Sequence, residues 1–255
     1  MRNSLSSRAG VSLLVFLGAC AETTPAPPAP VVAKSSAPAP ACPTAATPIP
    51  LHEPTAAPIT LEQLALVFPK RKIVVGFDVD DTLLFSAPAF NALQPEYDPD
   101  VIRPKKLDAL TPDQRAKYHE FWNRLNGEYD DRSVVKVVAQ KVLKLHLDRG
   151  DDVWIVSKRQ GIVPEPKEDV VTKRYERMLG VKLPHPVVQT QLQDKTPFLC
   201  ERHIELYYGD ADTDVTASVT AGATPIRIRR ANDSYAKDAV HDGQLGELVV
   251  QGSER

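Results

Sequence analysis

A short apolar run that ends in a cluster of carboxylates constrains the fold of this chain more than any other feature. Residues 73–77 read Ile-Val-Val-Gly-Phe and lead into Asp78, Asp80, Asp81 and Thr82. A continuous run rich in Val and Ile favours a strand buried on both faces of a parallel sheet. In open α/β sheets, ligands gather beyond the carboxyl ends of the strands. The sequence therefore predicts an acidic site at the end of this strand, with an ordinary Asp-rich turn as the alternative.

A second apolar run, residues 204–209, also ends in carboxylates. Asp210 and Asp214 follow it with the spacing Gly-Asp-x-x-x-Asp. Residues four apart at this point would span the turn into the next helix, so one could bind a metal ion and the other orient a ligand. We expect the two strand ends to bring their acids together, where oxygen ligands could hold a divalent cation.

Two more polar residues lie between these clusters. Ser157 ends the apolar run 153–156, and Lys195 begins a probable helix. Alone, neither is informative, because a Ser after a strand is usually a cap and a Lys is usually solvated. What is informative is the order along the chain: Asp-x-Asp-x-Thr, then Ser, then Lys, then Gly-Asp-x-x-x-Asp.

This order resembles the four motifs of the haloacid dehalogenase-like hydrolases. Residues 77–88, Phe-Asp-Val-Asp-Asp-Thr-Leu-Leu-Phe-Ser-Ala-Pro, resemble more closely the signature of the bacterial class B nonspecific acid phosphatases of that superfamily. Further segments follow in family order over residues 59–253: Phe121-Trp122, Arg149-Gly150-Asp151, Tyr208-Gly209-Asp210, Ile226-Arg227-Ile228 and Arg230-Ala231. The resemblance implies a Rossmann-like α/β/α core of three layers, with a parallel sheet and a small cap inserted after the first motif.

The resemblance also implies a mechanism and a ligand set. Asp78 would attack phosphorus to form an aspartyl-phosphate, and Asp80 would act as acid and then as base. Mg²⁺ would be held by Asp78, the backbone carbonyl of Asp80 and Asp210, with Asp214 close behind. Further substrate contacts would come from Thr82, Ser157, Arg159 and Lys195. From the residue types alone we would infer only metal-assisted phosphoryl chemistry.

Three aromatic residues stand where the class B family lines its leaving-group pocket: Phe90, Trp122 and Tyr235. Stacking on them would favour nucleoside and aryl monophosphates as substrates. Packing in the core is the alternative, and for Trp122 the two readings have equal weight. The implied partners are therefore small phosphomonoesters, and the resemblance suggests a homotetramer.

The chain departs from the family pattern in three places. Its second motif reads Ser157-Lys158-Arg159, where the family usually has Thr-Gly-Arg. The stretch between Phe90 and Phe121 looks longer than usual. Lipid anchoring, considered below, is more typical of class C relatives than of class B. A binding or scaffold protein that keeps the fold but has lost turnover is therefore the second hypothesis, and Lys158 is the feature that supports it.

Strand and helix patterns alternate from residue 59 onward, which indicates a parallel sheet covered on both faces. The motif at residues 60–63 predicts a capping box that opens a helix to about residue 67. We expect an insertion at about 86–132 and a helix over 133–148 that stops at Gly150. Further strands are expected at about 152–157, 185–189, 204–209 and 225–230, with helices near 166–178, 194–202 and 213–221.

The first 58 residues do not look like part of the folded domain of 59–255. Basic residues precede the apolar run 11–17, which is too short to span a bilayer and suits a secretory signal. The following Leu-Gly-Ala-Cys resembles a lipoprotein cleavage box, so residues 1–20 would be a signal peptide and Cys20 the lipidated residue. We expect an exported lipoprotein on the periplasmic face of the bacterial membrane, with a soluble periplasmic protein as the alternative. Residues 21–58, rich in Pro and Ala, predict an extended tether, with a proline ligand for a partner as the less favoured reading.

Charge and cysteine content narrow the function further. The net charge of −2 and pI of about 6.3 argue against a nucleic-acid-binding protein. Alternation of Arg227, Arg229 and Arg230 with Ile predicts a strand with a solvated face and no phosphate contact. Beyond Cys20 only Cys42 and Cys200 remain, which predicts no disulfide framework and no zinc site.

Overall fold

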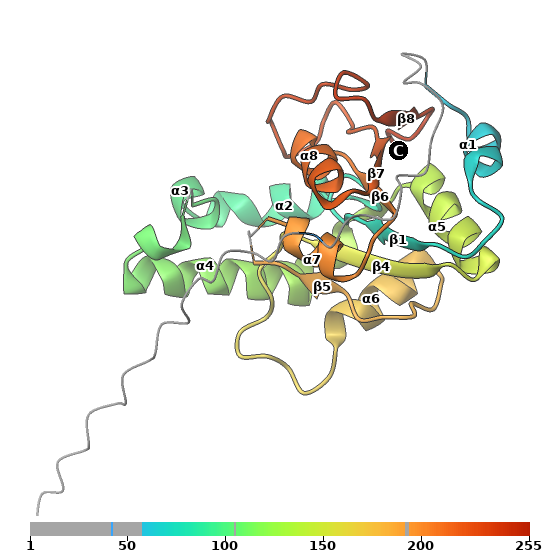
Figure 1. Cartoon of the computed structure of the whole chain (residues 1–255). Coiled ribbons are helices and arrows are strands. Elements are labelled where there is room, and N and C mark those ends of the chain that lie inside the picture. The colour runs from blue at the N-terminus through green and yellow to red at the C-terminus, as the bar shows by residue number, and fades with distance from the viewer. Residues whose placement is uncertain (1–41, 43–57, 105, 192–193) are drawn as a thin grey trace, which may run out of the picture. The chain divides into compact units, whose positions relative to one another are not determined.

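The computed structural model describes residues 42, 58–104, 106–191 and 194–255. The predicted signal peptide with Cys20, and the predicted tether except Cys42 and Pro58, lie outside these residues. The centre of the described chain is a six-stranded sheet in the order β5-β4-β1-β6-β7-β8 (Figure 1), and each neighbouring pair is parallel. Its strands are β1 (Val74–Phe77), β4 (Asp152–Ser157), β5 (Val188–Gln189), β6 (Leu206–Gly209), β7 (Thr224–Ile228) and β8 (Leu248–Val250). The predicted α/β fold with a parallel sheet is confirmed.

Successive side chains of a strand point to opposite faces of the sheet, and here both faces carry apolar residues. On one face, Val75 and Phe77 of β1 pack in a cluster that also contains residues of three helices: α1 (Leu61–Val67), α5 (Val137–Arg149) and α6 (Val170–Leu179). On the other face, Val74 packs with α7 (Thr196–Glu201) and α8 (Asp212–Ala221). The sheet is thus the middle of three layers, and β1 lies inside it between β4 and β6.

The segment after β1 forms a cap with its own core. The short strands β2 (Leu84–Phe85) and β3 (Val134–Val135) pair antiparallel at its base. Between them along the chain lie α2 (Ala87–Leu93), α3 (Pro99–Ile102), α4 (Pro112–Arg124) and a π-helical turn at Leu125–Tyr129. Thr111 caps α4 in a reciprocal pair with Gln114. Phe90, Tyr118 and Trp122 are buried in this cap and not in the core beside the sheet. The predicted insertion is therefore a compact unit between two short strands.

Several predicted boundaries change in the structure. The capping box at Thr60 and the helix to Val67 are confirmed. Residues 134–135, expected in a helix, pair with β2 instead, and α5 begins only at Val137. Strand β8 was not expected, because it is short and follows an irregular stretch.

The unexpected β8 also overturns the predicted solvated face of β7. Because β7 lies between β6 and β8, its five residues are all buried. Arg227 is fully buried and forms an ion pair of 2.7 Å with the buried Glu247. An alternating pattern of Ile and Arg can therefore come from a buried strand when each guanidinium has a carboxylate partner.

The sequence predicts no disulfide framework, but the structure has a bridge. Cys42 and Cys200 form a disulfide, which joins a residue assigned to the tether to α7. Sequence reasoning missed the pair because 158 residues separate the two cysteines and the first lies among Pro and Ala.

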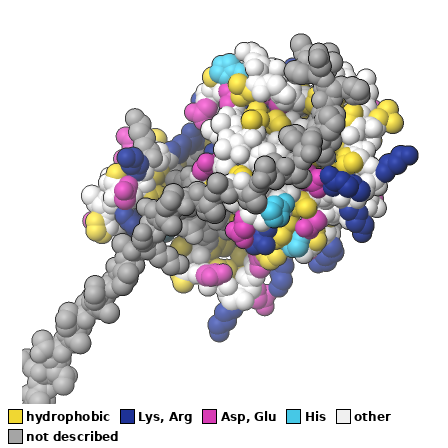
Figure 2. All heavy atoms as spheres, in the orientation of Figure 1, with side chains coloured by type: hydrophobic (Ala, Val, Ile, Leu, Met, Phe, Trp, Pro, Cys, Tyr) yellow, Lys and Arg dark blue, Asp and Glu magenta, His cyan; other side chains and the backbone are white. Residues whose placement is uncertain are grey.

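Among the described residues, none of the helices combines the length and the apolar composition needed to cross a bilayer. Figure 2 shows basic and acidic side chains on the face in view, with several basic side chains near its right-hand edge.

Candidate active site

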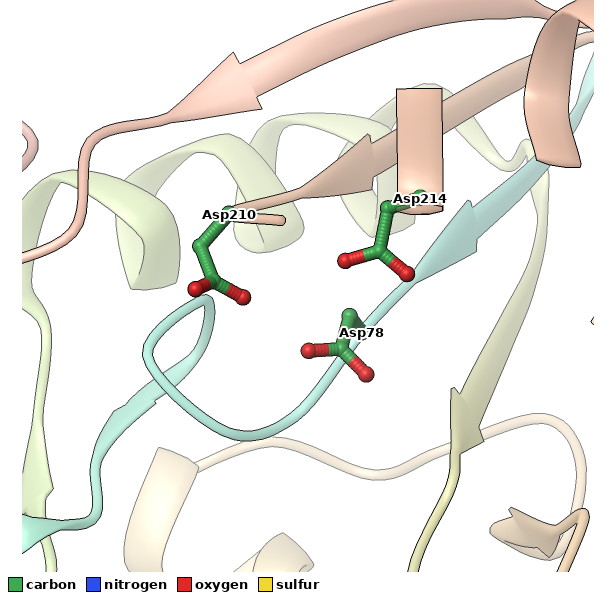
Figure 3. Close-up of side chains that lie close together, drawn as sticks. All are labelled: Asp78, Asp210 and Asp214. Carbon is green, nitrogen blue, oxygen red and sulfur yellow. The ribbon is translucent and has the colours of Figure 1, made fainter. Parts of the chain in front are cut away.

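Three buried carboxylates meet at the carboxyl edge of the central strands. Asp78 follows β1, Asp210 follows β6, and Asp214 lies in the first turn of α8. Phe77 and Tyr208 are paired in register, so the residues after these strands emerge side by side. One oxygen from each acid lies within 4.8 Å of the others (Figure 3). The two predicted acidic clusters therefore form one site.

The close approach of Asp214 depends on a glycine. A Cβ atom at Gly209 would lie 2.3 Å from the Cβ of Asp214, closer than real side chains come. The glycine at the end of β6 thus lets the first turn of α8 reach the acids. The predicted Gly-Asp-x-x-x-Asp spacing has a structural reason in this contact.

Lys195 supplies a buried cation beside the acids. It occupies the position just before α7, as predicted, and its Nζ binds Asp78 and lies 2.9 Å from Asp214 Oδ1. Burial works against its charge, but the two carboxylates raise the pKa of Lys195 well above its ordinary value. The lysine therefore stays charged and holds two of the three acids in place.

The acids still carry more negative charge than Lys195 can offset. Burial, together with the neighbouring carboxylates, raises the pKa of Asp78 to about 8 against the opposing effect of Lys195. Burial likewise raises the pKa of Asp210 to about 7. A trio of carboxylate oxygens is the hard donor set that Mg²⁺ takes, and a divalent cation among them would relieve this repulsion. The residues present fit a metal of this kind.

Asp80, whose backbone carbonyl is the expected metal ligand, directs its side chain to Arg159. Its side chain lies outside the three-acid cluster and accepts two hydrogen bonds from Arg159, at 2.8 and 2.7 Å. Burial would raise the pKa of Asp80, but Arg159 lowers it below its usual value. Arg159 is itself held by Asp130, at 2.9 Å, and by Asn126. Neither Asp130 nor Asn126 was singled out from the sequence.

Two predicted phosphate contacts have structural tasks in this arrangement. Thr82 Oγ1 lies 3.4 Å from Asp78 Oδ2 and from Asp210 Oδ1, so it bridges the first and last motifs. Ser157 accepts a hydrogen bond from the backbone N–H of Arg159. Among the described residues that line the acidic cavity, Ser157 does not appear, whereas its neighbour Lys158 does.

The acids have basic partners that the sequence reading missed. Arg230 Nε donates to Asp210 Oδ2 at 2.6 Å, which corrects its assignment to a solvated strand face. Lys136 is fully buried and donates to the carbonyl oxygens of Asp81 and Arg229. Asp81 accepts in turn from Ser234, and burial raises the pKa of Asp81 to about 6. Sequence reading identified the acids of the motifs. It did not identify Lys136, Arg230 and Ser234 as their partners, because these residues lie far from the acids along the chain.

Two cavities open beside this cluster and share a wall. The acidic cavity, of about 200 Å³, is lined by Asp78, Lys195, Asp210 and Asp214 among others. The aromatic cavity, of about 320 Å³, is lined by Phe90, Trp122 and Phe121 of the cap. The residues that line both are Asp80, Lys158, Tyr235, Ala236 and Asp238. A ligand with a small anionic end and a flat body could therefore occupy both.

The three predicted aromatic residues do come together. The rings of Phe90 and Tyr235 stack with centroids 3.7 Å apart, and Trp122 meets Phe90 edge to face at 6.0 Å. Each also contributes to the wall of the aromatic cavity. These rings therefore pack in the cap and also line the cavity.

Comparison with known proteins identifies relatives of this chain. No family model matches the chain. Class B acid phosphatases of Rahnella sp., Klebsiella pneumoniae and Proteus mirabilis are 35%, 33% and 34% identical to it, each over 71% of this chain and 73% of the relative. Two solved structures, titled a putative beta-phosphoglucomutase from Bacteroides vulgatus and a hydrolase from Pseudomonas syringae, align over 72% of this chain and over 85% and 94% of theirs. Both are 14% identical, with TM-scores of 0.48 and 0.47. By its identity to the curated relatives, the chain belongs to the class B acid phosphatase family.

Proposed function

We propose that this protein is an exported, Mg²⁺-dependent acid phosphatase that hydrolyses nucleoside and aryl monophosphates through an aspartyl-phosphate. Family membership supports the phosphomonoesterase activity. The single observation that carries the mechanism is the buried trio Asp78, Asp210 and Asp214 with Lys195 beside it, in a cavity that shares a wall with the aromatic cavity. Together these features offer a nucleophile, a cation site and a place for a flat leaving group.

Asp78 is the nucleophile in this proposal. Its carboxylate oxygen attacks phosphorus, the bond from phosphorus to the ester oxygen breaks, and the leaving group departs as an alcohol. Covalent catalysis of this kind splits one difficult displacement into two easier ones. Lys195 keeps Asp78 oriented and offers an N–H to a phosphoryl oxygen, as Arg230 and Lys158 do from other sides of the cavity.

Asp80 moves the proton. It must be protonated to donate to the leaving oxygen, and ionised to accept a proton from the water that hydrolyses the intermediate. Its bonds to Arg159 suit the ionised form. We infer that an entering phosphate draws Arg159 away from Asp80 and so permits the protonated form.

The magnesium ion would be held by Asp78, Asp210 and the backbone carbonyl of Asp80, with Asp214 and Lys195 orienting these ligands. When bound, Mg²⁺ would neutralise charge on the phosphoryl oxygens as they develop it. Bound among these residues, the ion would also offset the repulsion between the anionic nucleophile and the anionic ester.

The test is release of phosphate from phenyl phosphate and from adenosine monophosphate by the full chain, with Mg²⁺ and with a chelator. We expect turnover that the chelator stops and that Asp78→Asn lowers by at least about a thousandfold. Asp148→Asn, the same change on the exposed side of α5, is the matched control. Folded protein that binds Mg²⁺ but releases no phosphate would exclude the enzyme and leave the non-catalytic binding protein.

An alcohol acceptor tests a second activity of the same intermediate. Because the aspartyl-phosphate can react with an alcohol as well as with water, glycerol should yield glycerol phosphate at the expense of free phosphate. Free phosphate that stays equal to the released phenol in the presence of glycerol would argue against phosphotransfer.

Export and assembly belong to the proposal as well. The Cys42–Cys200 disulfide supports an oxidising compartment. Cys20→Ser should abolish incorporation of a labelled fatty acid in the expressing bacterium, and a protein that is found soluble in the periplasm with no label would favour an ordinary signal peptide. Sedimentation of the purified protein would test the homotetramer that the family resemblance suggests.

A further inference from the structure

The aromatic cavity carries a cation that has no carboxylate partner. Arg103 caps the carboxyl end of α3 and is exposed. It lines the aromatic cavity but not the acidic one. Its guanidinium lies 5.2 Å from the centre of the Tyr235 ring. Within the part of the chain that the structure describes, Arg103 makes no ion pair.

The other cations of this cavity are engaged elsewhere. Arg159 lies 5.6 Å from the centre of the Phe90 ring, but its charge is paired with Asp80 and Asp130. Lys158 donates at 3.0 Å to Thr213, a residue that lines the acidic cavity alone, so its Nζ is directed to the phosphate side. Arg103 is thus the cation directed to the leaving-group end.

Among the charged groups of the wall, Arg103 is the one placed to meet an anion. Three cations and two carboxylates line the aromatic cavity, and one of the carboxylates, Asp80, is already bonded to Arg159. The other, Asp238, makes no ion pair among the described residues, and its carbonyl oxygen accepts from Arg230. An arginine fork without a partner, held over a ring, matches a carboxylate or phosphate in the plane of a stacked ligand.

We propose that Arg103 binds an anionic substituent of the leaving group, so that the favoured substrates are aromatic monoesters with a carboxylate or a second phosphate. This inference rests on the proposed phosphatase function, because it assumes that the ester occupies both cavities. The phosphoryl group lies among the acids and Lys195, the ring lies beside Phe90 and Tyr235, and the distal anion reaches Arg103. Uncharged leaving groups would lack this last contact.

A matched pair of substrates tests the proposal. para-Carboxyphenyl phosphate carries the anion, and its methyl ester has a leaving group of similar size without the charge. We expect kcat/KM to favour the carboxylate by about fivefold, the scale of one charge-assisted contact near solvent, and the preference to shrink with added salt. Arg103→Gln should abolish this preference for the carboxylate ester. Lys106→Gln removes an exposed cation of the same loop that lines neither cavity, and it should leave the ratio as in the wild type.

A binding assay separates this inference from the proposed activity. para-Carboxybenzylphosphonate, its methyl ester and the corresponding bisphosphonate cannot be hydrolysed at the C–P bond, and calorimetry with Mg²⁺ gives their affinities. Tighter binding of an anionic phosphonate, lost in Arg103→Gln, supports the anion site even if no ester is hydrolysed. The carboxylate and bisphosphonate arms show which anion is preferred. An equal ratio in the wild type and Arg103→Gln, in either assay, overturns the proposal.

Discussion

At the scale of single residues, the site is held together by buried charges that restrain one another. Arg159 shows this most clearly, since one guanidinium binds Asp80, Asp130 and Asn126. Its side chain and that of Asp130 are each only 1% exposed. A buried pair of this kind is weak evidence for stability, but removal of one partner leaves a charge without compensation.

We therefore expect Asp130→Asn to lower the free energy of unfolding by about 3 kcal/mol and to lower kcat more than it raises KM. The reason is that Arg159 would lose one of the two carboxylates that fix it, so the position of Asp80, which must donate and accept a proton, would be less well defined. Urea unfolding and steady-state kinetics measure the two effects. Asp131→Asn is the control, because Asp131 is half exposed and pairs with Arg177 at 2.7 Å and more loosely with Arg174 at 3.5 Å, where about 0.5 kcal/mol is usual for an exposed pair. Equal effects of the two changes would show that Asp130 has no special position.

Lys158, which departs from the family pattern, supports a second prediction. Its Nζ borders the acidic cavity, so Lys158→Gly should raise KM about fivefold for all phosphomonoesters and change kcat little. Kinetics with a charged and an uncharged leaving group would check this, since the loss should be the same for both. Faster turnover in the glycine variant would mean that the lysine obstructs the site.

At the scale of elements, the end of β6 and the start of α8 must touch for the acids to meet. Gly209→Ala would place a methyl group against Asp214, so we expect the side chain to move and Mg²⁺ affinity to fall about tenfold, with about 2 kcal/mol lost in stability. Calorimetric titration with Mg²⁺ measures the first effect. Gly127→Ala is the control, because nothing lies within 4 Å of a Cβ there. Unchanged affinity in Gly209→Ala would show that Asp214 does not help to hold the metal.

The elements also show what sequence can and cannot provide. Asp78 and Asp210 could be placed together because apolar runs identify parallel strands, whose ends share an edge. Asp130 and Asn126 could not, because they face Arg159 only through the π-helical turn after α4, which leaves no clear local signal. Strand β8 and the buried Arg227 were missed for a related reason. A strand of three residues depends on its neighbours and not on its own pattern.

At the scale of the whole molecule, a buried series of hydrogen bonds links α5 to the sheet. His146 is fully buried; its Nδ1 lies 2.7 Å from Asp151 and its Nε2 lies 2.8 Å from the hydroxyl of Tyr208. Arg149 also donates to Asp151. Burial lowers the pKa of His146, against the opposing pull of Asp151. The neutral ring therefore donates to Asp151 and accepts from Tyr208.

The lowered pKa of His146 has a consequence for stability. The unfolded chain protonates His146 more readily than the folded chain does. The stabilising contribution of the buried neutral ring is therefore complete above about pH 6.5 and is lost as the pH falls below it. Urea unfolding at about pH 7.5 and about pH 5.5 should show the folded state weakening in acid. His146→Gln should lessen this slope, whereas His203→Asn, at an exposed position, should not. An unchanged slope in His146→Gln would assign the acid sensitivity to other groups.

The division of the site between sheet and cap has a consequence for how such a protein can diversify. The reacting acids stand at strand ends, whereas Phe90, Trp122 and Arg103 belong to one inserted segment between β2 and β3. Changes in that segment can alter which molecules are accepted while the strands that carry the reaction stay untouched. Natural drift or a deliberate exchange of α2 to α4 could therefore generate new selectivity in one step, provided that Asn126 and Asp130 of the same segment, which hold Arg159, are kept.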